Sequence, residues 1–215
     1  GWLQSRNEDG SWKRYDADWR ESTYKNYFWM VPYDLQGLID SIGGKEAAEK
    51  RLDEMFRRLD ASYGDEWFAS GNEPSFQIPW IYNWAGAPYK AQQVIRRILN
   101  EQYSSRVNGL PGNDDLGSMG AWYVFASIGL FPEIPGVGGF SVNSPVFRKI
   151  VLHLPEGDVI IKGGDEKKEY IHSLSLDGKK MEGTWIDWSD LYRGATLEYK
   201  LSGKPDKTWG TRIAP

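Results

Sequence analysis

The chain has 215 residues, of which 40% are hydrophobic and 26% charged, and its formal net charge is −4. These values are ordinary for a globular protein, and they exclude the basic footprint of a nucleic-acid-binding protein. No apolar run is long enough to span a bilayer, so neither nucleic acid nor a membrane span is expected.

The high content of aromatic residues is the unusual feature of the composition. The sequence contains 11 Trp, 12 Tyr and 8 Phe, but no Cys. Aromatic faces stack on C–H-rich ligands such as sugar rings, and they also fill cores because each buries a large area. Disulfides are excluded, which fits either the cytoplasm or an export compartment.

The sequence begins with Gly1 in place of an initiator Met and in the middle of a pattern. We therefore expect a portion of a longer protein whose targeting signal lies outside it. Residues 1–21 are polar and aromatic without a clean period, which predicts a loop or extended segment.

Five segments are predicted as helices. In four of them apolar residues recur at helical spacing, and the third, residues 76–84, is short and apolar enough to be a buried helix. Gly43-Gly44 separates the first two, which form an antiparallel pair, and Pro88 suits the first turn of the fourth. The fifth is apolar and ends before Gly129. The predicted helices are residues 31–42 with Pro32 near the start, 45–61, 76–84, 88–99 and 116–126.

After Pro135 the sequence pattern changes to short runs rich in β-branched and aromatic residues, separated by turns of Gly, Pro and Asp. Asp177-Gly178 between two runs predicts a hairpin. The fold class is therefore mainly α with a β tail, divided into residues 1–135 and an antiparallel region at 136–215. The predicted strands are residues 147–154, 158–162, 170–176, 180–185 and 196–201.

Three acidic loops each precede a predicted helix: residues 18–21, 71–74 and 113–115. Taken alone, each is an N-cap, because a carboxylate accepts the free N–H groups of a first turn and complements the helix dipole. In an array of antiparallel helix pairs, however, loops one pair apart lie on the same rim. Together they predict a polar pocket at one end of the helices.

Four blocks of the sequence carry a resemblance to a known family. They read ESTYKNYFWMVPYD from Glu21, GNEPSFQIPWIYNWAGAPYKAQ from Gly71, PGNDDLGSMGAWYVFASIGLFP from Pro111 and GFSVNSPVF from Gly139. In this order they resemble the calcium-dependent exo-α-mannosidases of glycoside hydrolase family 92. Such enzymes have an N-terminal β-sandwich, an (α/α)6 barrel and C-terminal strands. The resemblance thus implies that residues 1–135 are the last part of the barrel, and that the sandwich and the first part of the barrel are missing.

The resemblance also implies roles for individual residues. Glu21 falls on the general acid, and Asp114 and Asp115 fall on the acids that position and deprotonate the attacking water. Asn72 and Glu73, with Asp115, fall where the family binds Ca²⁺. For the substrate-binding residues around the acid, the resemblance implies Trp19, Asn26 and Trp29.

The physical chemistry suits these roles. An inverting glycosidase needs an acid and a base on opposite sides of the scissile bond, with room for a water molecule, and separate loops can supply that gap. Burial among Trp19, Tyr24 and Tyr27 would keep the acid protonated. Ca²⁺ takes oxygen ligands and could also hold sugar hydroxyls, whereas neither His has the spacing of a zinc site.

The sequence departs from the family pattern near the acid. Tyr24-Lys25-Asn26 replaces Ala-Trp-Gln, and Phe76-Gln77 replaces the His residues that commonly follow the GNEP block. We therefore expect a changed leaving-group subsite, and we hypothesise that Lys25 favours an anionic leaving group.

Three functions remain open at this point. The first is an exo-acting, inverting α-mannosidase that acts on mannose-containing glycans and is periplasmic or secreted, as the resemblance implies. The second is a non-catalytic sugar-binding or scaffold module, in which the acids cap helices and the tryptophans fill a core. The third is another (α/α)6 glycosidase, which an α-glucoside substrate would reveal.

Overall fold

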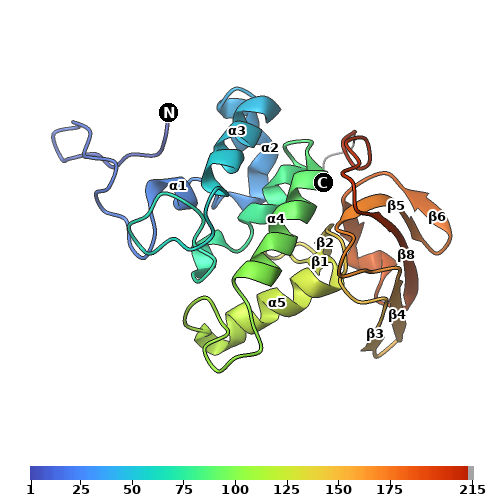
Figure 1. The fold of residues 1–215 in the computed structure, drawn as a ribbon. Coiled ribbons are helices and arrows are strands. Elements are labelled where there is room, and N and C mark those ends of the chain that lie inside the picture. Colours follow the sequence, from blue (N-terminus) through green and yellow to red (C-terminus); the bar gives the residue numbers. More distant parts are fainter. Residues whose placement is uncertain (213–215) are drawn as a thin grey trace.

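The computed structural model describes residues 1–212, with the helices on one side and most of the strands on the other (Figure 1). Within these residues the α-helices are α1 (Tyr24–Tyr27), α2 (Leu35–Ser41), α3 (Lys45–Met55), α4 (Pro88–Glu101) and α5 (Ser118–Ile128). Short 3-10 helices are η1 (Pro32–Asp34), η2 (Glu73–Ser75), η3 (Ile78–Asn83), η4 (Asp115–Gly117) and η5 (Trp188–Asp190).

Three of the predicted helices differ in extent or type. The first begins as the 3-10 helix η1 and becomes α-helical only from Leu35. The helix from Lys45 ends at Met55 rather than at residue 61, because the Met55 carbonyl accepts the amide of Phe68 and the chain then turns. The buried helix expected at residues 76–84 is present as the 3-10 helix η3, whose six residues are all buried. Its amides bond three residues back, as from Trp80 to Gln77.

A hydrophobic core lies among α2, α3, η3, α4 and α5, and aromatic side chains fill much of it. Trp29 and Trp80 are both 0% exposed. Trp80 stacks on Phe131 with ring centroids 4.0 Å apart, and Trp122 meets Trp80 edge to face. Many of the aromatic residues therefore fill the core, which was one of the two roles expected from the composition.

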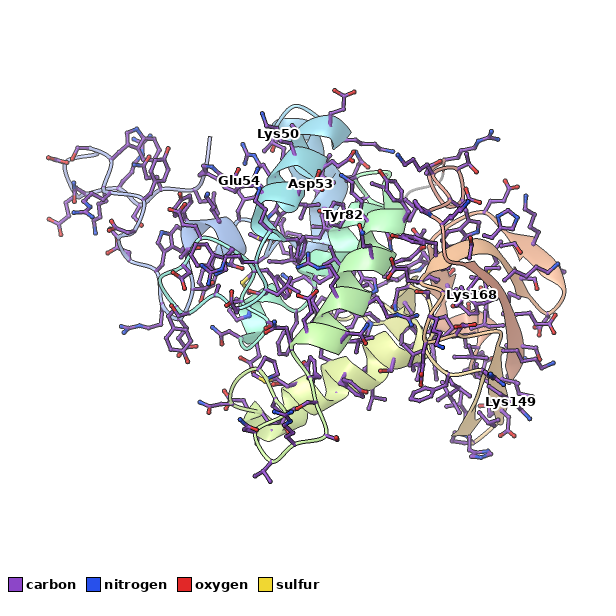
Figure 2. The ribbon with its side chains drawn as sticks, in the orientation of Figure 1. Lys50, Asp53, Glu54, Tyr82, Lys149 and Lys168 are labelled. Carbon is purple, nitrogen blue, oxygen red and sulfur yellow. The ribbon has the colours of Figure 1, made fainter. Side chains whose placement is uncertain are left out.

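A network of polar side chains holds α3 against η3 and α4 at the edge of this core. The hydroxyl of Tyr82 donates to Asp53 at 2.9 Å, and Lys90 forms ion pairs with Asp53 at 2.6 Å and Glu49 at 2.7 Å. Figure 2 labels Asp53 on α3 beside Tyr82. These bonds thus fix α3 to η3, which follows the second acidic loop, and to α4.

The strands form two sheets rather than one. A five-stranded sheet has the order β3-β4-β8-β5-β6, and a three-stranded sheet has the order β1-β2-β7. The strands are β1 (Leu130–Phe131), β2 (Gly139–Val142), β3 (Lys149–Leu154), β4 (Gly157–Lys162), β5 (Tyr170–Leu176), β6 (Lys179–Met181), β7 (Trp185–Asp187) and β8 (Ala195–Ser202).

The sheet topology corrects two expectations. The β tail is not wholly antiparallel, because β4 and β8 pair in parallel. The run expected as one strand at residues 180–185 divides between β6 and β7, since the buried Thr184 uses its carbonyl to accept the amide of Val142. With two sheets beside the helices, the description "mainly α" also needs correction to a mixed α and β fold.

The predicted hairpin turn is present between β5 and β6. Asp177 and Gly178 both have positive φ, at 49° and 77°, as the predicted β5–β6 turn requires.

The helices and the strand region are joined by Arg96. From α4, the buried Arg96 donates to the carbonyls of Asp165 at 2.8 Å and Glu166 at 3.0 Å. Strands β1 and β2 pair across residue 135, and the proposed boundary there stays a prediction.

Candidate active site

Segments from all three acidic loops line one pocket of about 410 Å³. Glu21 comes from the first loop, Asn72 and Glu73 from the second and Asp115 from the third. Residues 61–63 and 111–113 complete the wall. The pocket therefore lies where the sequence pattern predicts a polar site.

Two glycines allow the second and third loops to meet. A Cβ atom at Gly71 would overlap the carbonyl oxygen of Pro111, and one at Gly112 would overlap the carbonyl oxygen of Gly71. Only residues without a side chain permit this backbone approach. The crossing brings Asn72 and Glu73 into the same wall as Asp115.

Glu21 is held by its backbone, and the residue is exposed where it lines the pocket. Its φ is 62°, an uncommon value for a residue with a side chain. Asn72 Nδ2 donates to the Glu21 carbonyl, and the Tyr27 hydroxyl donates to the neighbouring Arg20 carbonyl at 2.6 Å. Backbone conformations of this kind cluster at functional sites.

The expected burial of Glu21 among aromatic residues is not found. Glu21 is exposed, whereas Tyr24 is buried and donates its hydroxyl to Glu66 at 2.8 Å. Trp19 stacks on Tyr27 with centroids 5.5 Å apart. These aromatic side chains pack on one another instead of enclosing the carboxyl group.

Asp114 and Asp115 have different surroundings. Asp114 Oδ1 accepts the amide of Gly120 at 2.9 Å, which caps the first turn of α5. Asp115 begins a run of three residues with positive φ, followed by Leu116 and Gly117, and its exposed side chain lines the pocket. The left-handed run thus separates a capping carboxylate from one that faces the pocket.

The residues expected to bind calcium offer only oxygen donors. Glu73 Oε1 accepts the Ser118 hydroxyl at 2.7 Å, which ties η2 to α5, and Asn72 is 6% exposed. Two carboxylates and an amide oxygen suit Ca²⁺ and not Zn²⁺. Residues 1–212 contain no cluster of three or more His, Cys, Asp or Glu side chains that could hold a metal ion. Carbonyls, water or sugar hydroxyls would have to complete a calcium shell.

Two residues expected to bind substrate belong to the core. Asn26 is 0% exposed, and its side chain donates to the Trp67 carbonyl at 3.1 Å and accepts the Ser75 hydroxyl at 2.9 Å. Trp29 is also 0% exposed. Neither side chain has surface for a sugar, which corrects the expectation. The third, Trp19, lies outside the pocket wall and donates Nε1 to the Tyr15 carbonyl at 2.6 Å.

Lys25 also lies away from the pocket. Its ammonium group pairs with Glu66 at 2.9 Å and Glu54 at 3.3 Å, and its side chain is 13% exposed. Figure 2 labels Glu54 on α3. Since two carboxylates already neutralise Lys25, the structure does not support its proposed role beside an anionic leaving group.

Tyr63 is a pocket residue that the sequence reasoning missed. It follows Ser62 and precedes Gly64 in a loop of acids, glycine and aromatics, and it is 61% exposed. An exposed aromatic between turn residues was the available signal, but nothing in the sequence placed that turn beside Glu21.

Carboxylates that face one pocket from separate loops are the arrangement with which glycoside hydrolases cleave glycosidic bonds. The profile of the glycosyl hydrolase family 92 catalytic domain matches residues 1–203, and the chain belongs to this family. The expected family is therefore confirmed.

Solved structures of the family have the same fold. The family GH92 α-mannosidase BT3965 of Bacteroides thetaiotaomicron is 31% identical with a TM-score of 0.90, and the match covers 100% of this chain and 30% of that one. The inverting mannosidase BT2199 of B. thetaiotaomicron VPI-5482 is 28% identical with a TM-score of 0.88, over 99% of this chain and 32% of that one.

A curated protein is also similar to nearly the whole chain. An uncharacterized secreted glycosidase of Arthroderma benhamiae is 30% identical, over 98% of this chain and 29% of that protein. The chain thus spans about a third or less of these relatives. No helix in residues 1–212 is long and apolar enough to cross a membrane.

Proposed function

We propose that this chain is the C-terminal part of an exo-acting, inverting α-mannosidase. The observation that carries the proposal is that Glu21 and Asp115, from separate loops, line one pocket with Asn72 and Glu73. The similar proteins of known structure include α-mannosidases, one of them described as inverting. Completion of the (α/α)6 barrel and the N-terminal sandwich would come from the rest of the enzyme.

In the proposed reaction, Glu21 acts as the general acid and Asp115 as the general base. Asp115 takes a proton from water as the water oxygen bonds to the anomeric carbon. The bond from that carbon to the leaving oxygen breaks, and Glu21 gives its proton to this oxygen. Water has then been added across the glycosidic bond, and attack from the opposite face inverts the anomeric centre.

Asn72, Glu73 and Asp115 are the proposed calcium ligands. When bound, Ca²⁺ would polarise the water and the sugar hydroxyls that it touches. Glu73 is already oriented by Ser118, and Asp114 orients the start of α5 beside it. The protein's own contribution is thus a fixed wall of oxygen donors along the pocket.

The proposed substrate is a terminal α-mannoside of a glycan, and the proposed location is the periplasm or the cell exterior. The secreted relative supports export. The enclosure that Glu21 lacks in this chain would be supplied by the other parts of the enzyme.

The test is hydrolysis of aryl α-mannosides by the full-length enzyme, with and without a calcium chelator. We expect turnover that the chelator removes, and NMR of the first product should show the inverted anomer. Glu21→Gln should slow substrates with poor leaving groups far more than a nitrophenyl mannoside, because only the former need the proton. Binding of mannosides without turnover would favour the sugar-binding module, and preference for α-glucosides would favour another glycosidase.

A further inference from the structure

Tyr63 supplies the aromatic side chain of the candidate active-site pocket. Among the described lining residues, the others are acidic, amide, hydroxyl, glycine, alanine or proline side chains. Tyr63 is 61% exposed there, although most aromatic side chains of the helical part pack into the core. An open aromatic face in a polar pocket can stack on the C–H face of a sugar ring.

The turn that carries Tyr63 is fixed. Asp65 Oδ2 accepts both the amide of Ser62 at 3.0 Å and its hydroxyl at 2.8 Å, and the amide of Asp65 donates to the Ser62 carbonyl at 3.1 Å. These bonds to the backbone and hydroxyl of Ser62 lower the pKa of Asp65, so it stays ionised and keeps the turn closed. A ring on a closed turn loses less freedom when a ligand stacks on it.

The loop that carries Tyr63 is attached to the side of the pocket that bears Glu21. Glu66, three residues after Tyr63, accepts the Tyr24 hydroxyl and pairs with Lys25, both in the segment just after Glu21. Asn72, a proposed calcium ligand, also bonds the Glu21 carbonyl, whereas Asp115 follows Gly112 at the Gly71–Gly112 crossing. Because Glu21 protonates the leaving oxygen in the proposed reaction, the loop beside it faces the leaving group.

We propose that Tyr63 is the platform on which the leaving-group sugar stacks, which makes it a residue that determines leaving-group specificity. The inference rests on the proposed function. It gives the exposed ring a role that neither the acid nor the base can fill, since both act on the scissile bond and not on the far sugar.

The experiment compares two substrates of the full-length enzyme: a mannose disaccharide and α-mannosyl fluoride, whose leaving group has no ring. Tyr63→Ala should lower kcat/KM for the disaccharide by about 3- to 10-fold, mainly through KM, and leave the fluoride unchanged. Tyr63→Phe keeps the face and should retain most of the disaccharide activity. Trp188→Ala removes an exposed aromatic residue outside this pocket and should change neither rate.

The possible outcomes separate the two proposals. Equal losses on both substrates, or no loss on the disaccharide, would overturn the role of Tyr63. If Tyr63→Phe loses as much as Tyr63→Ala, the hydroxyl and not the ring face matters, and the platform is also refuted. A wild-type enzyme that hydrolyses neither mannoside would refute the proposed function instead.

Discussion

Asp114 and Asp115 are neighbours in the chain, but their carboxylates have different partners. Asp114 accepts the Gly120 amide at the start of α5, whereas Asp115 lines the pocket. The sequence alone left open which of them contacts the attacking water, because either carboxylate could equally have been a helix cap. Because Asp114 is used as a cap and Asp115 lines the pocket, we propose Asp115 as the base and Asp114 as the residue that positions it.

Substitutions at the two positions should therefore differ. Asp115→Asn should lower kcat by about 10²- to 10⁴-fold, because an amide cannot take the water proton. Asp114→Asn keeps an oxygen for the Gly120 amide and should stay close to wild type, while Asp114→Ala should lower stability by about 1 kcal/mol through loss of the cap. Steady-state kinetics and thermal unfolding of the full-length enzyme give both readouts. A larger kcat loss in Asp114→Asn than in Asp115→Asn would exchange the two roles.

Removal of calcium should abolish activity, and Glu73 should control how much calcium restores it. Glu73→Gln keeps an acceptor for the Ser118 hydroxyl but removes a charged ligand, so we expect the calcium concentration for half activity to rise roughly tenfold or more. Calcium should also raise the Tm of the wild type, because it binds only the folded state. Glu46→Gln, on the exposed face of α3, is the matched control. Activity that survives a chelator would contradict the calcium proposal.

Lys25 should contribute to stability and not to selectivity. Lys25→Met removes the partner of Glu54 and Glu66 and should lower the free energy of unfolding by about 1 kcal/mol. Lys50→Met, on the outer face of α3 in Figure 2, should change stability much less. The ratio of kcat/KM for anionic and neutral leaving groups should stay the same in both variants. A fall of this ratio in Lys25→Met alone would restore the original hypothesis of an anionic leaving group.

Sequence periodicity predicted the regular elements of the fold well. The apolar spacing located α2 and α4, and β5 was predicted at its observed bounds because a turn signal follows it directly. The parallel pairing of β4 with β8 could not be predicted, since it joins segments separated by the three strands β5, β6 and β7 and depends on long-range pairing. The division of residues 180–187 between two sheets has the same origin.

Site residues whose role depends on neighbouring sequence could be predicted, whereas residues whose role depends on long-range packing could not. The three acidic loops could be located because turn residues and acids stand next to predicted helices. The burial of Asn26 and Trp29 was missed, since the resemblance placed them near the acid without saying which way each side chain points. Tyr63 was missed because its loop reaches Glu21 only through long-range bonds to α1.

Glu133 should make stability depend on pH. It is 2% exposed, and its carboxyl oxygens make no hydrogen bond in the part of the chain that the structure describes. Burial raises the pKa of Glu133 well above its ordinary value of 4.5. Above pH 4.5 the unfolded chain releases this proton while the folded protein retains it, so stability falls as pH rises until the folded pKa is reached.

Glu133→Gln replaces the protonated carboxyl group with a neutral amide of similar shape. We expect the variant to match the wild type near pH 4 and to gain over it by about 1.4 kcal/mol for each pH unit above 4.5, until the folded pKa is passed. Chemical unfolding of the full-length enzyme between pH 4 and 9 measures this difference. Glu8→Gln, an exposed site, controls for the loss of one negative charge. Parallel pH curves for the wild type and Glu133→Gln would mean that Glu133 is ionised in the folded protein and has a partner there.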